Sequence, residues 1–316
     1  GECSAVEVLS TIDQVRARTA RARAAGGRVG LVPTMGALHA GHVSLIGAAV
    51  ADGCDALVTV FVNPLQFAAG EDLDAYPRPI EADLAAAQAA GATWVFVPGD
   101  GEMYPQEPLT TVSVAGLGDA MEGASRPTHF AGVATVVTKL FAITGACRAY
   151  FGEKDFQQLA IVTRVAADLS LPVDVVGCPI VREPDGLALS SRNVYLTPDE
   201  RTAAPVLHRA LVEAADLIAA GERSVQAVRA HIEARITAEP LAHFDYAEVV
   251  DPTTMQPAEL ALPGVRILAA AQFGIPRLLD NVPTDPAGTS PAIALSTSDP
   301  EVSTGDRAPR RGGRDT

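Results

Sequence analysis

The first half of the chain alternates short apolar, β-branched runs with longer stretches whose apolar residues recur at helical spacing. The short runs predict buried strands at residues 29–32, 56–62, 93–97, 148–151 and 173–178. Helical spacing predicts helices over residues 6–25, 42–52, 79–90, 132–144 and 156–169. Strands that alternate with helices form a parallel sheet covered by helices. The pattern therefore predicts an α/β domain over residues 1–184.

The rhythm changes in the second half of the chain. Residues 198–220 and 224–238 predict two helices, whereas residues 244–250, 265–271 and 277–282 predict strands with no helix between them. This order indicates a separate, small α+β domain over residues 185–283. From about residue 284 onward Pro, Ser, Thr, Asp and Arg dominate, and that composition predicts a disordered tail over residues 284–316.

Composition narrows the class of protein. A chain of 316 residues that is 48% hydrophobic can build a core, and its formal charge of −14 argues against nucleic acid as a partner. The same charge disfavours an aminoacyl-tRNA synthetase. The four cysteines are far apart and form no CxxC pair, which is typical of reduced thiols in a cytoplasmic protein. The longest apolar stretch, residues 132–147, is interrupted by Lys139, so we expect no membrane partner.

Residues 29–42 carry the clearest chemical signal. An apolar strand runs into a Gly turn, and a His-x-Gly-His step then opens a helix. A helix N-terminus attracts anions, and Gly36 and Gly41 allow backbone to approach a ligand closely. His39 and His42 project from one side of that helix start, where imidazoles suit phosphate oxygens. A partial metal site or a structural histidine remains the alternative interpretation.

Further polar clusters follow the later strands. Asn63 and Gln66 frame a Pro turn, where they either bind a polar small molecule or brace the turn. Lys154, one of two lysines against 22 arginines, lies in a Gly turn beside Asp155, which is either functional or a helix cap. Residues 181–193 form either a phosphate-binding loop or a solvated linker, and residues 122–129 either a surface loop or part of the mouth of the site.

The remaining histidines lie in the predicted second domain. His208, His231 and His243 have no polar neighbours in the sequence pattern. We therefore interpret them as structural residues.

Six ordered blocks closely resemble the pantothenate synthetase (pantoate–β-alanine ligase) family, a member of the H-x-G-H nucleotidylyl-transfer group. The blocks are Pro33-Thr34-Met35-Gly36-Ala37-Leu38-His39-Ala40-Gly41-His42, Phe61-Val62-Asn63-Pro64-Leu65-Gln66-Phe67, Tyr76-Pro77-Arg78, Arg126-Pro127-Thr128-His129-Phe130-Ala131-Gly132-Val133, Phe151-Gly152-Glu153-Lys154-Asp155 and Leu189-Ser190-Ser191-Arg192-Asn193. The resemblance implies a Rossmann-like ATP domain, a smaller C-terminal domain and a homodimer. It also implies condensation of pantoate with β-alanine through pantoyl adenylate, with release of AMP and pyrophosphate.

The resemblance also implies residue roles. The catalytic residues would be His39, His42, Lys154 and Arg192, with His42 as proton donor. Gln66 would bind pantoate and β-alanine, and Gln158 would bind pantoate. Mg2+ is expected to accompany ATP; its protein ligands stay unassigned at Glu81-Ala82-Asp83. The ATP-binding residues would be Met35, Gly36, Ala37, Leu38, His39, Ala40, Gly41, His42, Gly152, Glu153, Lys154, Asp155, Val181, Leu189, Ser190, Ser191 and Arg192.

Two alternative functions share the phosphate-binding motifs. A nucleotidylyltransferase of the H-x-G-H group would stop at a nucleotidylylated product without forming an amide. A non-catalytic regulator would bind ATP and turn nothing over. Product analysis with and without β-alanine separates the three functions, because a ligase stalls at a bound acyl adenylate when the amine is omitted.

Overall fold

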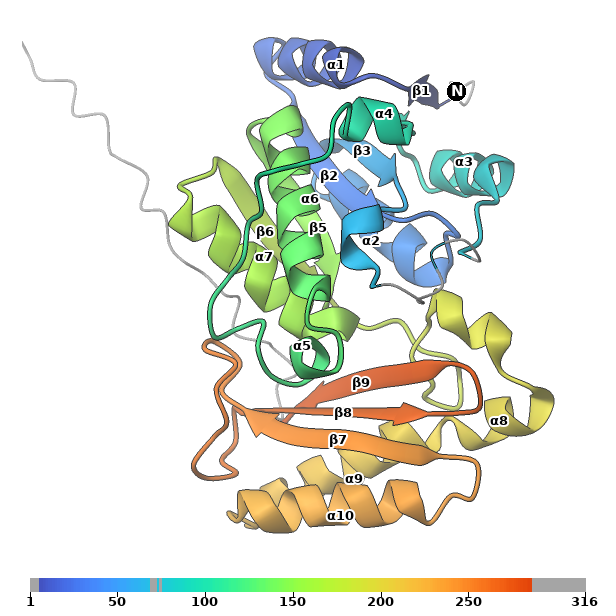
Figure 1. Cartoon of the computed structure of the whole chain (residues 1–316), viewed down its shortest axis with the longest axis vertical. Coiled ribbons are helices and arrows are strands. Elements are labelled where there is room, and N and C mark those ends of the chain that lie inside the picture. Colours follow the sequence, from blue (N-terminus) through green and yellow to red (C-terminus); the bar gives the residue numbers. More distant parts are fainter. Residues whose placement is uncertain (1–5, 69–72, 74–75, 286–316) are drawn as a thin grey trace, which may run out of the picture.

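The computed structural model describes residues 6–68, 73 and 76–285 and contains two sheets (Figure 1). The larger is a six-stranded parallel sheet in the order β1-β4-β3-β2-β5-β6. Its strands are β1 (Glu7–Leu9), β2 (Arg28–Thr34), β3 (Cys54–Val60), β4 (Trp94–Phe96), β5 (Cys147–Gly152) and β6 (Val173–Cys178). The smaller is antiparallel, in the order β7-β8-β9. The α/β class predicted from the sequence is confirmed.

Helices cover both faces of the parallel sheet. One face packs against α1 (Ile12–Ala24), α6 (His129–Thr144) and α7 (Phe156–Asp168), and the other against α2 (Ala40–Ala51) and α3 (Ile80–Ala89). Alternate strand residues serve the two layers: Leu31 and Leu57 belong to the first core, Val32 and Val58 to the second. Because β2, β3, β4 and β5 are buried on both faces, these four strands read as largely apolar runs, and this is why their positions could be predicted from the sequence.

The strand order places a switch point beside β2. From β2 the chain proceeds through β3 and β4 on one side, and then through β5 and β6 on the other. In open parallel sheets, ligands bind beyond the carboxyl ends of the strands where the order reverses. The segments that follow β2 and β5 are therefore the expected walls of a site.

The smaller sheet consists of β7 (His243–Val250), β8 (Arg266–Gln272) and β9 (Arg277–Pro283) and is backed by α9 (Val206–Ala219) and α10 (Val225–Thr237). Its other face turns toward the parallel sheet (Figure 1), and Leu268 joins the same apolar cluster as Phe156. The domain boundary after residue 184 stays a prediction; it falls in a turn closed by a bridge between Arg182 and Ala188. The predicted tail lies outside the described residues from residue 286 onward.

Two helix predictions differ from the structure. The segment 6–25 begins as strand β1, and α1 starts only after Thr11, whose side chain forms a capping box with Gln14. The segment 198–220 divides into α8 (Pro198–Ala203) and α9, because Pro205 has no N–H to continue the first helix. Short elements complete the described chain: η1 (Pro64–Gln66), α4 (Asp100–Met103), α5 (Glu122–Ser125), η2 (Glu153–Asp155) and η3 (Ser191–Tyr195).

Within residues 6–68, 73 and 76–285, no helix combines the length and apolar character that a membrane span requires.

Candidate active site

The turn after β2 is shaped by a buried carboxylate from α3. Gly36 adopts a φ of +87°, and its N–H donates to Thr34 Oγ1 over 3.1 Å. Asp83, which is 2% exposed, accepts the next two backbone N–H groups, from Ala37 at 3.0 Å and Leu38 at 2.7 Å. Asp83 thus fixes the approach to α2 from outside the motif.

The two histidines hold each other at the start of α2. Nδ1 of His39, the N-cap, accepts from Gly41 N over 3.1 Å, and Nδ1 of His42 accepts from His39 N over 3.3 Å. A Cβ on Gly41 would lie 2.7 Å from Cε1 of His39, so only glycine leaves room for the ring. Because each Nδ1 accepts, each neutral ring carries its proton on Nε2. The centroids of the two rings lie 4.1 Å apart, so the arrangement provides two neighbouring Nε2–H donors.

Both imidazoles are neutral at physiological pH. The pKa of His42 is lowered to about 3; burial is the largest cause, the neighbouring His39 and Lys154 also lower this pKa, and Asp155 opposes them. Burial also lowers the pKa of His39, with Lys154 as the second cause. A pair in this state can offer a ligand N–H dipoles rather than positive charge.

The turn after β5 brings an ammonium group to the same cavity. β5 ends at Gly152, and η2 then presents Lys154, whose Nζ lies 3.4 Å from Asp155 Oδ1. Lys154 and Asp155 line one cavity with His39 and His42. The structure thus unites the imidazoles and the lysine, which come from the two strands on either side of the switch point.

Asn63 braces the turn after β3. Its Nδ2 donates to Gln66 Oε1 at 3.1 Å and to Gly132 O at 3.2 Å, and its Oδ1 accepts from Tyr104 Oη at 2.8 Å. The helix α6 approaches so closely that a Cβ on Gly132 would lie 2.2 Å from Leu65 O. Of the two interpretations of Asn63, these contacts favour the structural one.

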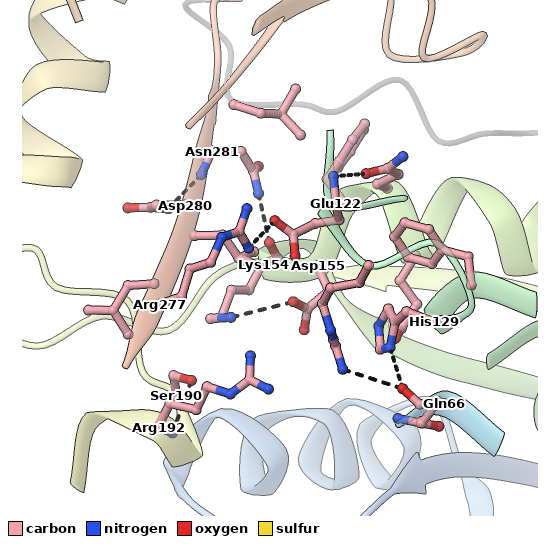
Figure 2. Close-up of a pocket in the computed structure, with 18 of the residues that line it drawn as sticks. Gln66, Glu122, His129, Lys154, Asp155, Ser190, Arg192, Arg277, Asp280 and Asn281 are labelled. Atoms are coloured by element: carbon pink, nitrogen blue, oxygen red, sulfur yellow. Dashed lines mark hydrogen bonds and ion pairs between the residues drawn. The ribbon is translucent and has the colours of Figure 1, made fainter. Parts of the chain in front are cut away.

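Gln66 lines both the cavity of the histidines and an adjoining cavity. The side-chain Nε2 of Gln66 donates to Met35 Sδ at 3.0 Å. The backbone carbonyl oxygen of Gln66 accepts from Arg126 Nη2 at 3.3 Å and from His129 Nδ1 at 3.1 Å. Figure 2 shows His129 and Gln66 facing each other below Asp155. Arg126 and His129 line the adjoining cavity, so of the two interpretations of this segment, these contacts favour part of the mouth of the site.

The loop before η3 supplies a further wall. The cavity of the histidines is lined by Val181, Leu189, Ser190 and Ser191, whereas the adjoining cavity is lined by Arg192. Ser190 Oγ accepts from Arg192 N over 3.2 Å and caps η3. The loop therefore lies against the site and is not a solvated linker.

The smaller sheet closes the adjoining cavity. Arg277 of β9 binds Glu122 Oε1 through Nη1 at 2.5 Å, and Tyr246 Oη donates to the same oxygen at 3.3 Å. All three residues line this cavity together with Lys154 and Arg192. Figure 2 shows Arg277 and Glu122 beside Lys154. Sequence reasoning missed Arg277 and Tyr246, because nothing local distinguishes them from other residues of an amphipathic strand.

The chain is similar to known proteins over most of its length. A family model described as pantoate-beta-alanine ligase matches residues 7–283. The chain belongs to the pantoate–β-alanine ligase family. It is 48% identical to the pantothenate synthetase of Rhizorhabdus wittichii over 89% of this chain and 100% of that protein. It is 52% identical to that of Heliobacterium modesticaldum over 87% and 99%.

Solved structures of the family share the fold. Pantothenate synthetase from Thermus thermophilus superposes with a TM-score of 0.84 at 46% identity, covering 89% of this chain and 100% of that one. A pantoate–β-alanine ligase from Francisella tularensis, complexed with β-γ ATP and β-alanine, gives 0.73 at 29% identity, covering 90% and 100%.

Most residues singled out by resemblance to the ligase family lie on the cavity walls. Gly36, Ala37, Leu38, Ala40 and Glu153 do not. The first four belong to the turn and helix start that position the histidines, and Glu153 points to the smaller sheet. The walls are formed by Met35, His39, Gly41, His42, Gln66, Gly152, Lys154, Asp155, Gln158, Val181, Leu189, Ser190, Ser191 and Arg192.

The histidines of the second module differ in part from expectation. His208 Nδ1 lies 3.4 Å from Asp280 Oδ2, and His231 Nε2 lies 3.1 Å from Glu213 Oε2. The expectation that they lack polar neighbours is wrong, because the tertiary fold brings carboxylates from other elements. Neither residue lines the two cavities of the site.

Proposed function

We propose that this cavity is where the chain, a pantoate–β-alanine ligase by family, joins pantoate to β-alanine with ATP. The observation that carries the proposal is the convergence of two Nε2–H donors and the Lys154 ammonium at the switch point of the sheet. A carboxylate is a poor electrophile and must be activated before an amine can attack it. Such activation needs donors placed where charge develops on phosphate oxygens.

The reaction divides into two steps. A pantoate carboxylate oxygen attacks the α-phosphorus of ATP, the bond to the β-phosphate breaks, and pyrophosphate leaves with the electron pair. The amine of β-alanine then attacks the acyl carbonyl, loses a proton, and AMP departs as the amide forms. No covalent bond to the enzyme is required, so positioning and charge stabilisation account for the rate.

We assign His42 and His39 as hydrogen-bond donors to the phosphates. A proton-donating imidazolium at position 42 disagrees with a pKa of about 3 caused by burial. The neutral ring still donates through Nε2–H, since its Nδ1 accepts from backbone. Lys154 and Arg192 supply the formal positive charge that offsets the leaving pyrophosphate.

The same cavity has an apolar side suited to a branched hydroxy acid. Its lining includes Val133, Val136 and Leu140 of α6, together with Phe61. Gln66 and Gln158 stand on its wall with amide groups that match hydroxyl and carboxylate partners. We assign both amides to pantoate, and Gln66 also to β-alanine.

The donor set fits Mg2+ that arrives with the triphosphate. Within the described ranges, no three His, Cys, Asp or Glu side chains gather into a cage. Mg2+ commonly binds through substrate phosphates and one or two carboxylates, and the half-exposed Asp155 on the cavity wall is suited to that part. Bound there, the cation would neutralise charge on the phosphates.

The function is tested by product analysis. Purified chain is incubated with ATP, Mg2+, pantoate and β-alanine, and the products are identified by mass spectrometry. We expect pantothenate, AMP and pyrophosphate, and a bound pantoyl adenylate when β-alanine is omitted. A nucleotidylylated end product or ATP binding without turnover would refute the ligase function.

We also propose a homodimer, implied by the family resemblance; sedimentation at the mass of one chain would contradict it.

A further inference from the structure

The turn that carries Lys154 is fastened by a residue of the smaller sheet. Asn281 of β9, which is 1% exposed, donates through Nδ2 to Glu153 O and to Lys154 O, each over 2.9 Å. Figure 2 shows Asn281 on its strand above Lys154. A single side chain thus donates to two consecutive carbonyls of η2. Asn281 lies 127 positions after Lys154 in the chain.

A buried arginine completes this attachment. Arg266 of β8, 2% exposed, donates from Nε to Asn281 Oδ1 at 2.8 Å and from Nη2 to Glu153 Oε2 at 2.9 Å. Its guanidinium stacks 4.1 Å from the centroid of the Phe156 ring. Buried charges persist only when paired and hydrogen-bonded, so this cluster fixes one geometry. It orients the Asn281 amide with its nitrogen toward η2.

Asp280, the residue before Asn281 on β9, holds the loop that leads to Ser190–Arg192. Asp280 accepts from Arg182 over 2.6 and 2.9 Å, a two-pronged pair, and Arg182 Nη1 also donates to Gly186 O at 3.0 Å. Adjacent strand residues point to opposite faces. Consecutive residues of one strand therefore contact the Lys154 turn on one face and the loop that leads to Ser190–Arg192 on the other.

We propose that Asn281 is a positioning residue for the adenylation step, which acts by fixing the backbone of Lys154. The role rests on the proposed function of the cavity. A lysine ammonium sits on a flexible stem, so its place relative to the histidine pair depends on where the backbone of η2 is held. The loss of both amide donors frees that backbone. It leaves the histidine pair, which is fixed by other contacts, undisturbed.

The test separates the two half-reactions. Asn281→Ala is assayed for pantoate-dependent pyrophosphate release at saturating ATP, and for aminolysis of added pantoyl adenylate by β-alanine. We expect the first rate to fall about 10–100-fold, the scale for displacing a reacting group by about 1 Å. Aminolysis, which needs no charge on a triphosphate, is expected to change less than about 3-fold, well below that scale.

A double-mutant cycle supplies a readout that a structural role would not move. Once Lys154→Ala has removed the ammonium, adding Asn281→Ala should cost little further rate, because the positioned group is gone. The matched control is Thr284→Val. Thr284 is buried close to Asn281 in the chain, and its contacts with Leu262, Gly264 and Val265 stay within the smaller module. It should lower stability and leave both half-reactions near wild-type rates.

The outcomes are distinct. Equal losses in the wild-type and Lys154→Ala backgrounds, or an equal loss in Thr284→Val, would refute the role of Asn281. Wild-type chain without pantoate-dependent pyrophosphate release would refute the function of the cavity, and this role with it. If Asn281→Ala does not fold, Asn281→Ser, which keeps one donor on a shorter side chain, takes the same cycle with a smaller expected loss.

Discussion

The histidine pair and the Lys154 turn face one cavity but are built in opposite ways. The pair is nearly self-sufficient: His39, Gly41 and His42 fix one another within a few residues, with Asp83 as the outside support. The Lys154 turn depends on β8 and β9 of the smaller sheet. A local motif thus gives half of the site its geometry, and docking of a second module gives the other half.

The largest effect should come from removing either group. We expect His42→Ala and Lys154→Ala each to lower the rate of adenylate formation about 100–1,000-fold, the scale for one donor to developing charge. Pantoate-dependent pyrophosphate release measures this rate. Unchanged circular dichroism of the variants would show that the loss is chemical. Near wild-type rates for both would overturn the assignment of the cavity.

The contrast explains what the sequence revealed. The histidine segment was predictable because its chemistry and its supports are adjacent in the chain. Lys154 stood out as a rare lysine in a Gly turn, although its supports did not. Nothing near Asn281 or Arg277 indicates contact with a segment more than a hundred residues earlier, so only tertiary structure places them.

The parallel sheet was predictable for a related reason. Its central strands β2, β3, β4 and β5 are buried on both faces and read as largely apolar runs, so their positions needed no tertiary information. Element ends were less accessible. The strand β1 is too short to show a period, and the break at Pro205 depends on one missing N–H.

A second prediction removes the outside support of the histidine pair. Asp83→Asn keeps the shape of the side chain but turns an amide donor toward one of the two N–H groups it now accepts. We expect a loss of about 2 kcal/mol in the free energy of unfolding, within the range for an unsatisfied buried donor. Urea unfolding measures the loss. Glu81→Gln, an exposed charge change on the same helix, is the control; equal effects would contradict a specific role for Asp83.

A third prediction concerns pH. Burial lowers the pKa of His42 to about 3 in the folded chain, whereas an unfolded histidine titrates near 6.5. Below about pH 6.5 the unfolded state therefore binds the extra proton, and stability falls as the pH is lowered toward 3. At about pH 5 we expect His42 to cost about 1–2 kcal/mol, discounted because part of the ring borders the open cavity.

Unfolding free energies of wild type and His42→Gln at several pH values measure this cost. The variant should lose less stability between about pH 7 and pH 5 than the wild type does. His243→Gln, at an exposed position at the start of β7, controls for the loss of one histidine. Parallel pH curves for wild type and His42→Gln would show that the ring is not held neutral by burial.

The smallest expected effect on the rate concerns two glycines of α2, Gly41 and Gly47. A Cβ on Gly41 would strike the His39 ring at 2.7 Å, whereas a Cβ on Gly47 meets nothing within 4 Å. Gly41→Ala should therefore lower pyrophosphate release about 10-fold, which corresponds to about 1.4 kcal/mol. Gly47→Ala should leave that rate unchanged and raise stability by about 0.5–1 kcal/mol, because alanine favours the helix interior. Equal rates for the two variants would mean that the His-x-Gly-His spacing does not depend on room for the first imidazole, and the local construction of this half of the site would have to be abandoned.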